Sequence, residues 1–217
     1  EPQKKNSHRF NIFLDGQFAF GADEDLVVSR RLVIGKEVSP EDLDKILFEA
    51  QVGKLMERMY RLFNVRNRSE KEVRDYFRIK NYESRIMGKE QYSDLVIDAT
   101  VEMLKKKGLL NDQQFTRDWV EARGKKYGVK RIKQELFQKG IEREIVDEVI
   151  NRQVTVDSEE NLANQALQKK IKTWKNLPIL EFKKKAYEYL MRRGFEYSLT
   201  KSVVEKMLEN GYNDKEW

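Results

Sequence analysis

Apolar residues recur with helical spacing from Ser39 almost to the end of the chain, but the segment before Ser39 has a different pattern. Residues 9–14 and 17–20 are two short runs rich in β-forming side chains. Between them stand Asp15 and Gly16, a pair that supports the positive φ angles of a type I′ turn. The pattern predicts a β-hairpin. Because two strands alone are marginally stable in water, a helix or a third strand must cover this hairpin.

Asp23, Glu24 and Asp25 precede a short apolar run and predict a brief helix. With the hairpin, this helix completes a predicted N-terminal extension over residues 1–38. A long helix is predicted to follow, because Ser39 can accept a hydrogen bond from a free amide and Pro40 suits the first helical position. We expect this helix to run to about residue 67.

An internal repeat is the most informative feature of the sequence. Each copy has apolar residues at positions i and i+4, then a basic residue, then Asn or Gly, and then a large apolar residue. The copies are Val73, Phe77, Lys80, Asn81 and Tyr82; Ile132, Leu136, Lys139, Gly140 and Ile141; and Ala186, Leu190, Arg193, Gly194 and Phe195. This order is typical of a helix C-terminus, where a cation meets the negative end of the dipole and Gly or Asn adopts the left-handed conformation. The middle helix of each copy is therefore predicted to end at Asn81, Gly140 and Gly194.

A further stretch with helical periodicity lies on each side of every middle helix, which predicts three tandem three-helix repeats. The first covers residues 39–110, the second 111–154 and the third 155–217. The predicted fold is mainly α, an elongated curved rod with a small N-terminal β-hairpin cap, because repeats of this kind contact mainly their neighbours.

The composition supports small helical units over one large core. Hydrophobic residues make up 39% of the chain and charged residues 37%, against about 45–50% and about 25% in ordinary domains. The net charge is +6, with both signs interspersed. Such a surface can approach a polyanion, although it lacks the dense positive field of a DNA-packaging protein.

The residue types needed for common catalytic and metal sites are scarce. The chain has no cysteine, and its one histidine, His8, is expected in a polar tail. No Ser-His or Cys-His pair can form, and no glycine-rich phosphate loop is present. We therefore expect no enzyme activity, no metal and no cofactor. The absence of cysteine and of long apolar runs further predicts a cytoplasmic monomer without a membrane partner.

The central part of the chain resembles the RecX family. The matching residues are Leu109, Leu110, Asn111, Asp112, Phe115, Trp119, Val120 and Arg123, followed by Gly128, Arg131, Ile132, Glu135, Leu136, Lys139, Gly140 and Ile141. Arg68, Ser69, Glu72 and Val73 resemble the first repeat of that family. The third repeat departs from the pattern, because Ala186 stands where the other copies have Val or Ile.

The resemblance implies a bacterial regulator of the RecA recombinase. Members of this family bind in the groove of RecA filaments on single-stranded DNA and modulate, mainly by inhibition, strand exchange, ATP hydrolysis and repressor cleavage. The alternative is a helical repeat protein that binds nucleic acid directly and acts without RecA. Weak, non-specific DNA binding is compatible with both hypotheses.

Two basic stretches are candidate surfaces for the RecA filament or for DNA. The first contains Arg123, Lys125, Lys126, Lys130, Arg131, Lys133 and Lys139, and the second contains Lys169, Lys170, Lys172, Lys175, Lys183, Lys184, Lys185, Arg192 and Arg193. A solvated helix face is the alternative interpretation of each. Trp174 stands inside the second stretch, where stacking on a base competes with the more common role in packing. Phe115 and Trp119 are expected in the core. Charge reversal at Lys126, Lys130 and Arg131 is expected to weaken filament binding and to leave the helices intact.

Overall fold

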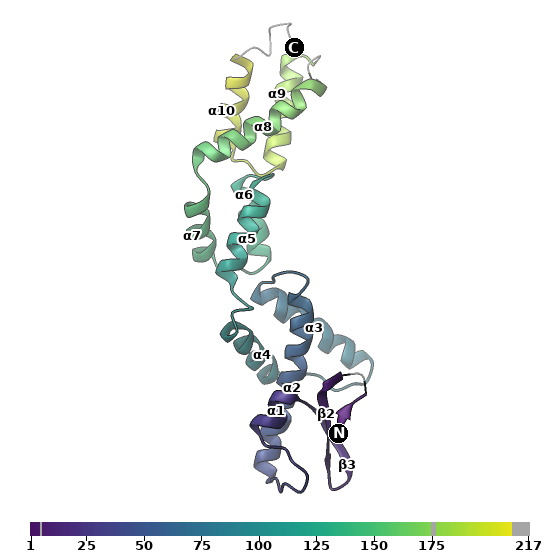
Figure 1. The fold of residues 1–217 in the computed structure, drawn as a ribbon. Coiled ribbons are helices and arrows are strands. Elements are labelled where there is room, and N and C mark those ends of the chain that lie inside the picture. The colour runs from purple at the N-terminus through teal and green to yellow at the C-terminus, as the bar shows by residue number, and fades with distance from the viewer. Residues whose placement is uncertain (5, 175–176, 210–217) are drawn as a thin grey trace. The chain divides into compact units, whose positions relative to one another are not determined.

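The computed structural model of the chain describes residues 1–4, 6–174 and 177–209 (Figure 1). Within these residues the chain forms ten α-helices and one three-stranded antiparallel sheet. It divides into two compact units, Glu1–Asn111 and Asp112–Trp217. The predicted mainly α class, with three successive groups of three helices after an N-terminal sheet, is confirmed.

The N-terminal sheet contains the predicted hairpin and one additional strand. Strands β1 (Pro2–Gln3), β2 (Asn6–Leu14) and β3 (Gln17–Asp23) lie in that order. At the turn between β2 and β3, Asp15 has a φ of 49° and Gly16 a φ of 80°, as a type I′ turn requires. Strand β1 was not predicted, because two residues are too few to show the alternation typical of a strand.

A short helix, α1 (Glu24–Ser29), follows β3 as expected, and the Asp23 side chain accepts a hydrogen bond of 2.8 Å from the amide of Leu26. The expectation that His8 lies in a polar tail is wrong. His8 belongs to β2, and its Nδ1 lies 2.9 Å from Oε2 of Glu24. Alternation along β2 brings this side chain to the start of α1, a contact that composition alone does not reveal.

The first repeat consists of α2 (Pro40–Phe63), α3 (Glu70–Ile86) and α4 (Asp94–Lys106). Ser39 caps α2 by accepting a 3.2 Å hydrogen bond from the amide of Asp42, as predicted. Helix α2 ends before residue 67, because residues 64–68 form the connection to α3. Ser69 begins α3 with a capping box in which it and Glu72 satisfy each other's backbone amides.

The prediction that the middle helix of the first repeat ends at Asn81 is wrong. Helix α3 continues to Ile86, and the left-handed residue after it is Gly88, with a φ of 63°. The reason is a contact outside the helix. The Asn81 amide donates to the Tyr92 carbonyl at 2.8 Å and accepts from the Tyr92 amide at 2.9 Å, so its side chain holds the next segment instead of terminating its own helix.

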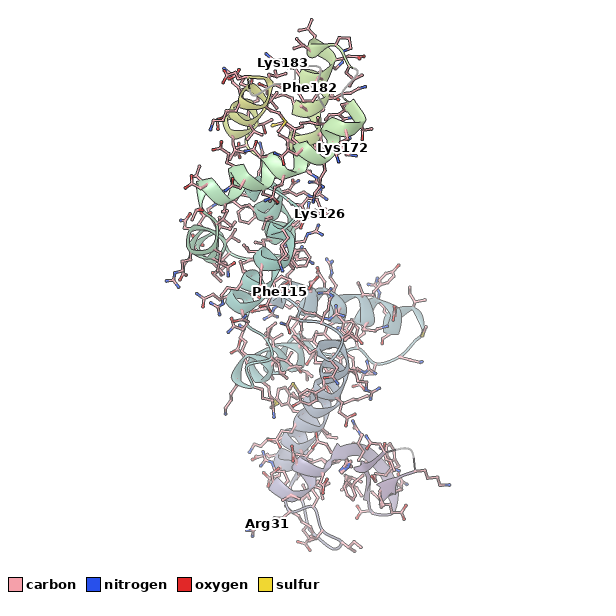
Figure 2. All side chains as sticks on the ribbon, turned by 45° about the horizontal axis from the view of Figure 1, so that its top comes forward. Arg31, Phe115, Lys126, Lys172, Phe182 and Lys183 are labelled. Carbon is pink, nitrogen blue, oxygen red and sulfur yellow. The ribbon has the colours of Figure 1, made fainter. Side chains whose placement is uncertain are left out.

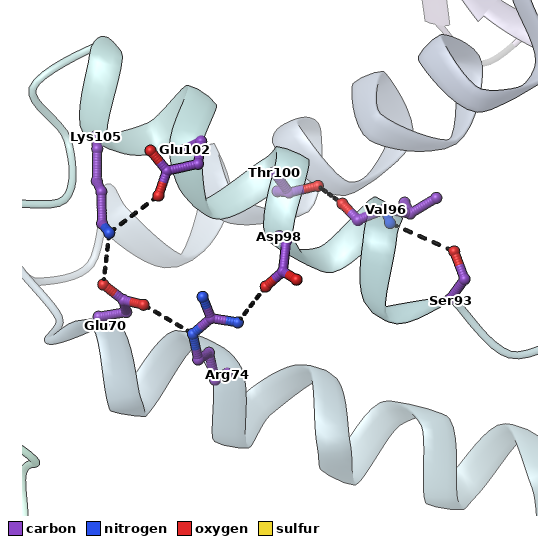
Figure 3. A network of polar contacts seen from close by, with 8 residues as sticks. All are labelled: Glu70, Arg74, Ser93, Val96, Asp98, Thr100, Glu102 and Lys105. Atoms are coloured by element: carbon purple, nitrogen blue, oxygen red, sulfur yellow. Dashed lines mark hydrogen bonds and ion pairs between the residues drawn. The ribbon is translucent and has the colours of Figure 1, made fainter. Parts of the chain in front are cut away.

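Ionic contacts join α3 to α4 in the first repeat (Figure 3). Arg74 lies 2.8 Å from Glu70 and 2.6 Å from Asp98 of α4, and Lys105 of α4 lies 2.9 Å from Glu70. Lys105 also lies 3.0 Å from Glu102, so two cations meet three carboxylates in this network. Partial burial raises the pKa of Glu70, but the bonds and charges of Lys105 and Arg74 together outweigh it and the pKa is lowered.

The second repeat consists of α5 (Asp112–Gly124), α6 (Val129–Gln138) and α7 (Arg143–Gln153). The third consists of α8 (Val156–Trp174), α9 (Ile179–Arg192) and α10 (Tyr197–Met207). Here the predicted terminators are confirmed: Gly140 has a φ of 76° after α6, and Gly194 a φ of 86° after α9. Both positions are in the left-handed region that favours glycine.

Each group of helices has its own core of buried side chains. The first repeat packs around Phe77, the second around Leu136 and the third around Phe182, and a smaller cluster around Leu26 lies under the N-terminal sheet. The low apolar content of the chain is therefore divided among four small cores. None of the described helices combines the length and the apolar character that a bilayer span requires.

Candidate functional site

Tyr127 lies in the short connection between α5 and α6 and is surrounded by cations. The guanidinium carbon of Arg131 lies 4.1 Å from the ring centroid, that of Arg123 lies 4.4 Å away, and the Lys126 ammonium 5.5 Å away. Each such contact stabilises an exposed site by about 0.5–1 kcal/mol. The α5–α6 turn thus brings together three residues of the first predicted basic stretch.

Glu135 on α6 fixes the two arginines. Its carboxylate accepts hydrogen bonds from Nε of Arg123 at 2.8 Å, from Nε of Arg131 at 3.1 Å and from the Trp119 indole at 3.1 Å. The bond from Arg123 is the main cause of the lowered pKa of Glu135; partial burial opposes it, and the bonds from Arg131 and Trp119 add to it. Glu135 is therefore ionised at neutral pH and holds the guanidinium groups in one geometry.

Lys139 adds a further cation to this group, with its ammonium 4.4 Å from the Trp119 ring centroid. The whole set is called the Tyr127 cluster below, and its members are Trp119, Arg123, Lys126, Tyr127, Arg131, Glu135 and Lys139. Around the Tyr127 ring three cations, Arg123, Lys126 and Arg131, face one carboxylate, Glu135, so the cluster attracts anions. Because its own cations already lie over its aromatic rings, contact with a ligand through charge is favoured over base stacking.

The first turn of α6 is joined to the end of α9. The amide of Gly128 donates to the carbonyl of Arg193 at 3.0 Å, and that of Lys130 donates to the carbonyl of Gly194 at 3.1 Å. Free N–H groups at one helix start thereby meet free C=O groups at another helix end, and the signs of the two dipoles agree. We call this contact the α6–α9 joint.

Glycine is required on both sides of the α6–α9 joint. A Cβ atom on Gly128 would lie 2.6 Å from the Phe195 amide nitrogen, and one on Gly194 would lie 2.6 Å from the Arg131 amide nitrogen. Neither distance is compatible with a side chain. The two repeats approach each other at backbone distance here, which fixes the second repeat against the third.

The α6–α9 joint brings cations of the third repeat beside the Tyr127 cluster. Arg131 donates from a terminal guanidinium nitrogen to the carbonyl of Arg192 at 3.3 Å. Beyond it, Tyr189 has the Arg193 guanidinium at 4.8 Å and the Lys170 ammonium at 5.7 Å from its ring centroid. Cations over tyrosine rings therefore continue from one repeat to the next.

A carboxylate of α8 completes the α6–α9 joint. Oε1 of Glu159 accepts a 2.8 Å hydrogen bond from the amide of Val129, and the side chain lines a cavity of about 420 Å³ between α5, α6 and α8. Burial raises the pKa of Glu159, the bond from Val129 opposes this, and the negative charge of Glu196 adds to it. Holding this charge therefore has a cost to folding.

The structure separates the predicted basic residues into three classes. Arg123, Lys126 and Arg131 meet in the Tyr127 cluster, with the exposed Lys130 next to them on α6. Lys133 instead pairs with Asp147 of α7 at 2.6 Å, which makes it a contact within the repeat. Lys125 is exposed on the rim of the cavity that contains Glu159.

The second predicted stretch is only partly assembled. Lys170 lies over Tyr189, and Figure 2 shows Lys126 after α5, Lys172 near the end of α8 and Lys183 on α9. Among the described residues, no contact joins the remaining candidates to the Tyr127 cluster. These are Lys169, Lys172, Lys183, Lys184 and Lys185, and Lys175 lies outside the described residues.

The aromatic residues follow the packing interpretation. Trp174 meets Phe182 edge-on at 6.2 Å and Tyr189 at 5.7 Å, within the core of the third repeat. Phe115 is buried in the second repeat and stacks on the partly buried Trp119 at 5.7 Å. The indole of Trp119 is also a hydrogen-bond donor to Glu135, a role that the sequence pattern did not indicate.

Two tyrosines at the centre of this surface, Tyr127 and Tyr189, were not singled out from the sequence. Lys139 of the first basic stretch lies over Trp119, and Arg193 of the second lies over Tyr189. The α6–α9 joint was not predicted either. Gly128 offered the one available signal, because a glycine just before a helix permits close approach of another backbone.

Comparison with known proteins identifies relatives over nearly the whole chain. Residues 1–39 match the family model "Regulatory protein RecX N-terminal domain", residues 111–150 match "RecX, second three-helix domain", and residues 157–204 match "RecX, third three-helix domain". The Regulatory protein RecX of Clostridium beijerinckii is 31% identical over 99% of this chain and 96% of its own length. That of Bacillus velezensis is 32% identical over 94% of this chain and 74% of its own length.

Solved structures have the same fold. A crystal structure of regulatory protein RecX superposes with a TM-score of 0.73 at 23% identity, covering 91% of this chain and 94% of its own. RecX from Lactobacillus salivarius superposes with a TM-score of 0.63 at 18% identity, covering 73% of this chain and 97% of its own.

Proposed function

The chain belongs to the RecX family of regulatory proteins, and we propose that it regulates the RecA recombinase by binding in the groove of RecA filaments on single-stranded DNA. In this proposal it modulates, mainly by inhibition, strand exchange, ATP hydrolysis and repressor cleavage. Its action is steric and allosteric: an occupied groove blocks duplex DNA or repressor and alters filament assembly. The chain contributes no catalytic step of its own.

One observation supports this proposal above all: cations of the second and third repeats lie on both sides of the α6–α9 joint, and we call this set the cationic strip. It consists of the Tyr127 cluster before the joint and of Arg193 and Lys170, which lie over Tyr189, after it. A fixed series of modest ionic contacts suits a long repetitive partner, because linked weak contacts combine into strong binding. A nucleoprotein filament presents acidic groups and phosphates at regular intervals.

The test is binding of the full chain to preformed RecA filaments on single-stranded DNA, measured by co-sedimentation. Lys125, Lys126 and Lys130 are exposed, and no ion pair holds them among the described residues. The triple variant Lys125→Glu, Lys126→Glu and Lys130→Glu should bind at least tenfold more weakly. Arg131 is left unchanged, because it bonds to Glu135 and to the carbonyl of Arg192. Reversing its charge would break these bonds and disturb the fold as well as the surface charge.

A matched control separates local from net charge. Lys4→Glu, Lys106→Glu and Lys107→Glu change the same number of exposed lysines in the N-terminal unit, and no ion pair holds these three among the described residues either. The proposal requires near-normal filament binding by this control. Equal loss of binding by both triple variants would leave only a net-charge effect, and no loss by either would remove this surface from the interaction.

Direct nucleic-acid binding without RecA is the competing function. Its test is the affinity for naked single- and double-stranded DNA across a salt series. Tight binding in the absence of RecA, with a steep decline as salt rises, would favour the competitor, since each phosphate contact adds to the salt slope.

A further inference from the structure

The first repeat contains a cleft that exists because α3 is longer than its counterparts. Residues 81–86 of α3 extend past the position at which α6 and α9 end. Together with the following segment 87–92 and with α2, they enclose a cleft of about 660 Å³. All residues of this cleft belong to the N-terminal unit. No residue of the Tyr127 cluster takes part in it.

The wall of this cleft is held in place by side-chain contacts. The two hydrogen bonds between Asn81 and the backbone of Tyr92 tie the segment 87–92 to α3. The Arg58 guanidinium of α2 lies 5.6 Å from the Tyr92 ring centroid, and the Lys80 ammonium lies 5.8 Å from that of Tyr76. The cleft is thus a built feature with its cations already positioned.

The cleft carries positive charge that the protein does not neutralise. Five cations and two carboxylates line it, and one of those carboxylates, Glu83, pairs with Lys80 at 2.6 Å. Among the described residues, Lys54, Arg58 and Lys89 have no carboxylate partner. Arg74 of α3, which does not line the cleft, is by contrast paired with both Glu70 and Asp98 (Figure 3). The unpaired cations of the cleft remain available to an anionic ligand.

Apolar side chains lie inside this cationic rim. Leu62 and Met87 line the cleft, and Met87 is 65% exposed. A methionine adapts to ligands of different shape because its thioether chain is flexible and polarisable. The cleft therefore offers cations that can bind anionic groups and apolar side chains that can pack against a large apolar group.

We infer that this cleft binds an acidic peptide segment that carries at least one large apolar side chain. Nucleic acid fits less well, because the tyrosine rings Tyr76 and Tyr92 already have cations over them and present no free stacking platform. The apolar side chains of Leu62 and Met87 also have no complement in a phosphodiester backbone. A peptide offers amide groups to Gln51 and Gln91 of the lining, carboxylates to the cations and an apolar group to Met87.

The inference does not depend on the RecA proposal, because it concerns another repeat and another class of contact. Its test uses the full chain and fluorescence anisotropy with a labelled synthetic peptide in which Asp and Glu alternate with Leu and Phe. An all-acidic peptide and oligothymidylate serve as comparison ligands. The mixed peptide should bind at least tenfold more tightly than either.

Variants locate the binding. Lys54→Glu with Arg58→Glu should weaken peptide binding at least tenfold, and Met87→Ala should weaken it about threefold. Lys45→Glu, on the same helix but outside the cleft, should leave it unchanged. Circular dichroism checks the fold, and Lys89→Glu, which lies outside any helix, replaces the double variant if α2 is disturbed.

Three results would overturn the inference. Unchanged peptide binding by the cleft variants would place the peptide elsewhere. Tighter binding of oligothymidylate, lost in the same variants, would make the cleft a nucleic-acid site. Equal binding of the all-acidic peptide would remove the apolar part of the recognition.

Discussion

At the scale of single residues, Glu135 fixes the geometry of the candidate surface, although it is itself negatively charged and the surface is positive. Its bonds hold Arg123 and Arg131, which lie over the Tyr127 ring, and the indole of Trp119. A positioned guanidinium loses less freedom on binding than a mobile one, so this carboxylate prepares the surface for an anionic partner.

Replacement of Glu135 by Gln should lower the free energy of unfolding at neutral pH by on the order of 1 kcal/mol, because charge-assisted hydrogen bonds are lost. The lowered pKa of Glu135 gives the sign of the pH dependence. Its contribution is present above the pKa of the unfolded chain and disappears as pH falls through the lower folded value. Urea titrations of both proteins at neutral and acidic pH measure this, and parallel acid profiles would contradict it.

Glu159 should have the opposite effect. Its raised pKa means that the folded state holds the charged form at a cost. Glu159→Gln keeps an oxygen for the Val129 amide and removes the charge, so it should stabilise the protein at neutral pH. The advantage should shrink as pH falls through the folded pKa and vanish below the unfolded one. A destabilised variant at neutral pH would show that the charge itself holds the joint.

At the scale of elements, the local signals predicted most boundaries. The Asp15-Gly16 turn, the Ser39 cap and the glycines after α6 and α9 depend on residues next to them in sequence. The end of α3 was not predicted correctly, because it depends on the contact between Asn81 and Tyr92, which lies eleven residues further along the chain. The same reason hid the α6–α9 joint: Gly128 indicates that some backbone can approach it, but Gly194 lies far away in sequence, and no local pattern identifies it as the partner.

The α6–α9 joint should open when Gly194 is replaced by Ala, because that residue has a φ of 86° and a Cβ would collide with α6. Hydrogen exchange of the Lys130 amide, which donates to the Gly194 carbonyl, should then become faster. Gly108→Ala is the matched control: its φ of 70° imposes the same backbone strain, but nothing lies within 4 Å of an added Cβ. Equal protection of Lys130 in all three proteins would argue against the joint.

At the scale of the whole molecule, the sequence predicted the architecture better than the site. Helical periodicity and the threefold motif led to three groups of helices, each of which has its own core. The candidate surface was predicted only as basic stretches, since charge along a helix does not tell which cations are already paired. Lys133 and Asp147 show this. The curved rod expected from the tandem repeats stays a prediction.

The central claim is that the chain acts on RecA through the cationic strip of its second and third repeats. The most direct measurement adds purified chain to preformed RecA filaments on single-stranded DNA and follows ATP hydrolysis and filament length together. The account predicts that both fall as the chain is added and that the Lys125, Lys126 and Lys130 triple variant has little effect. Unchanged hydrolysis and length with the native chain, or equal inhibition by the variant, would contradict it.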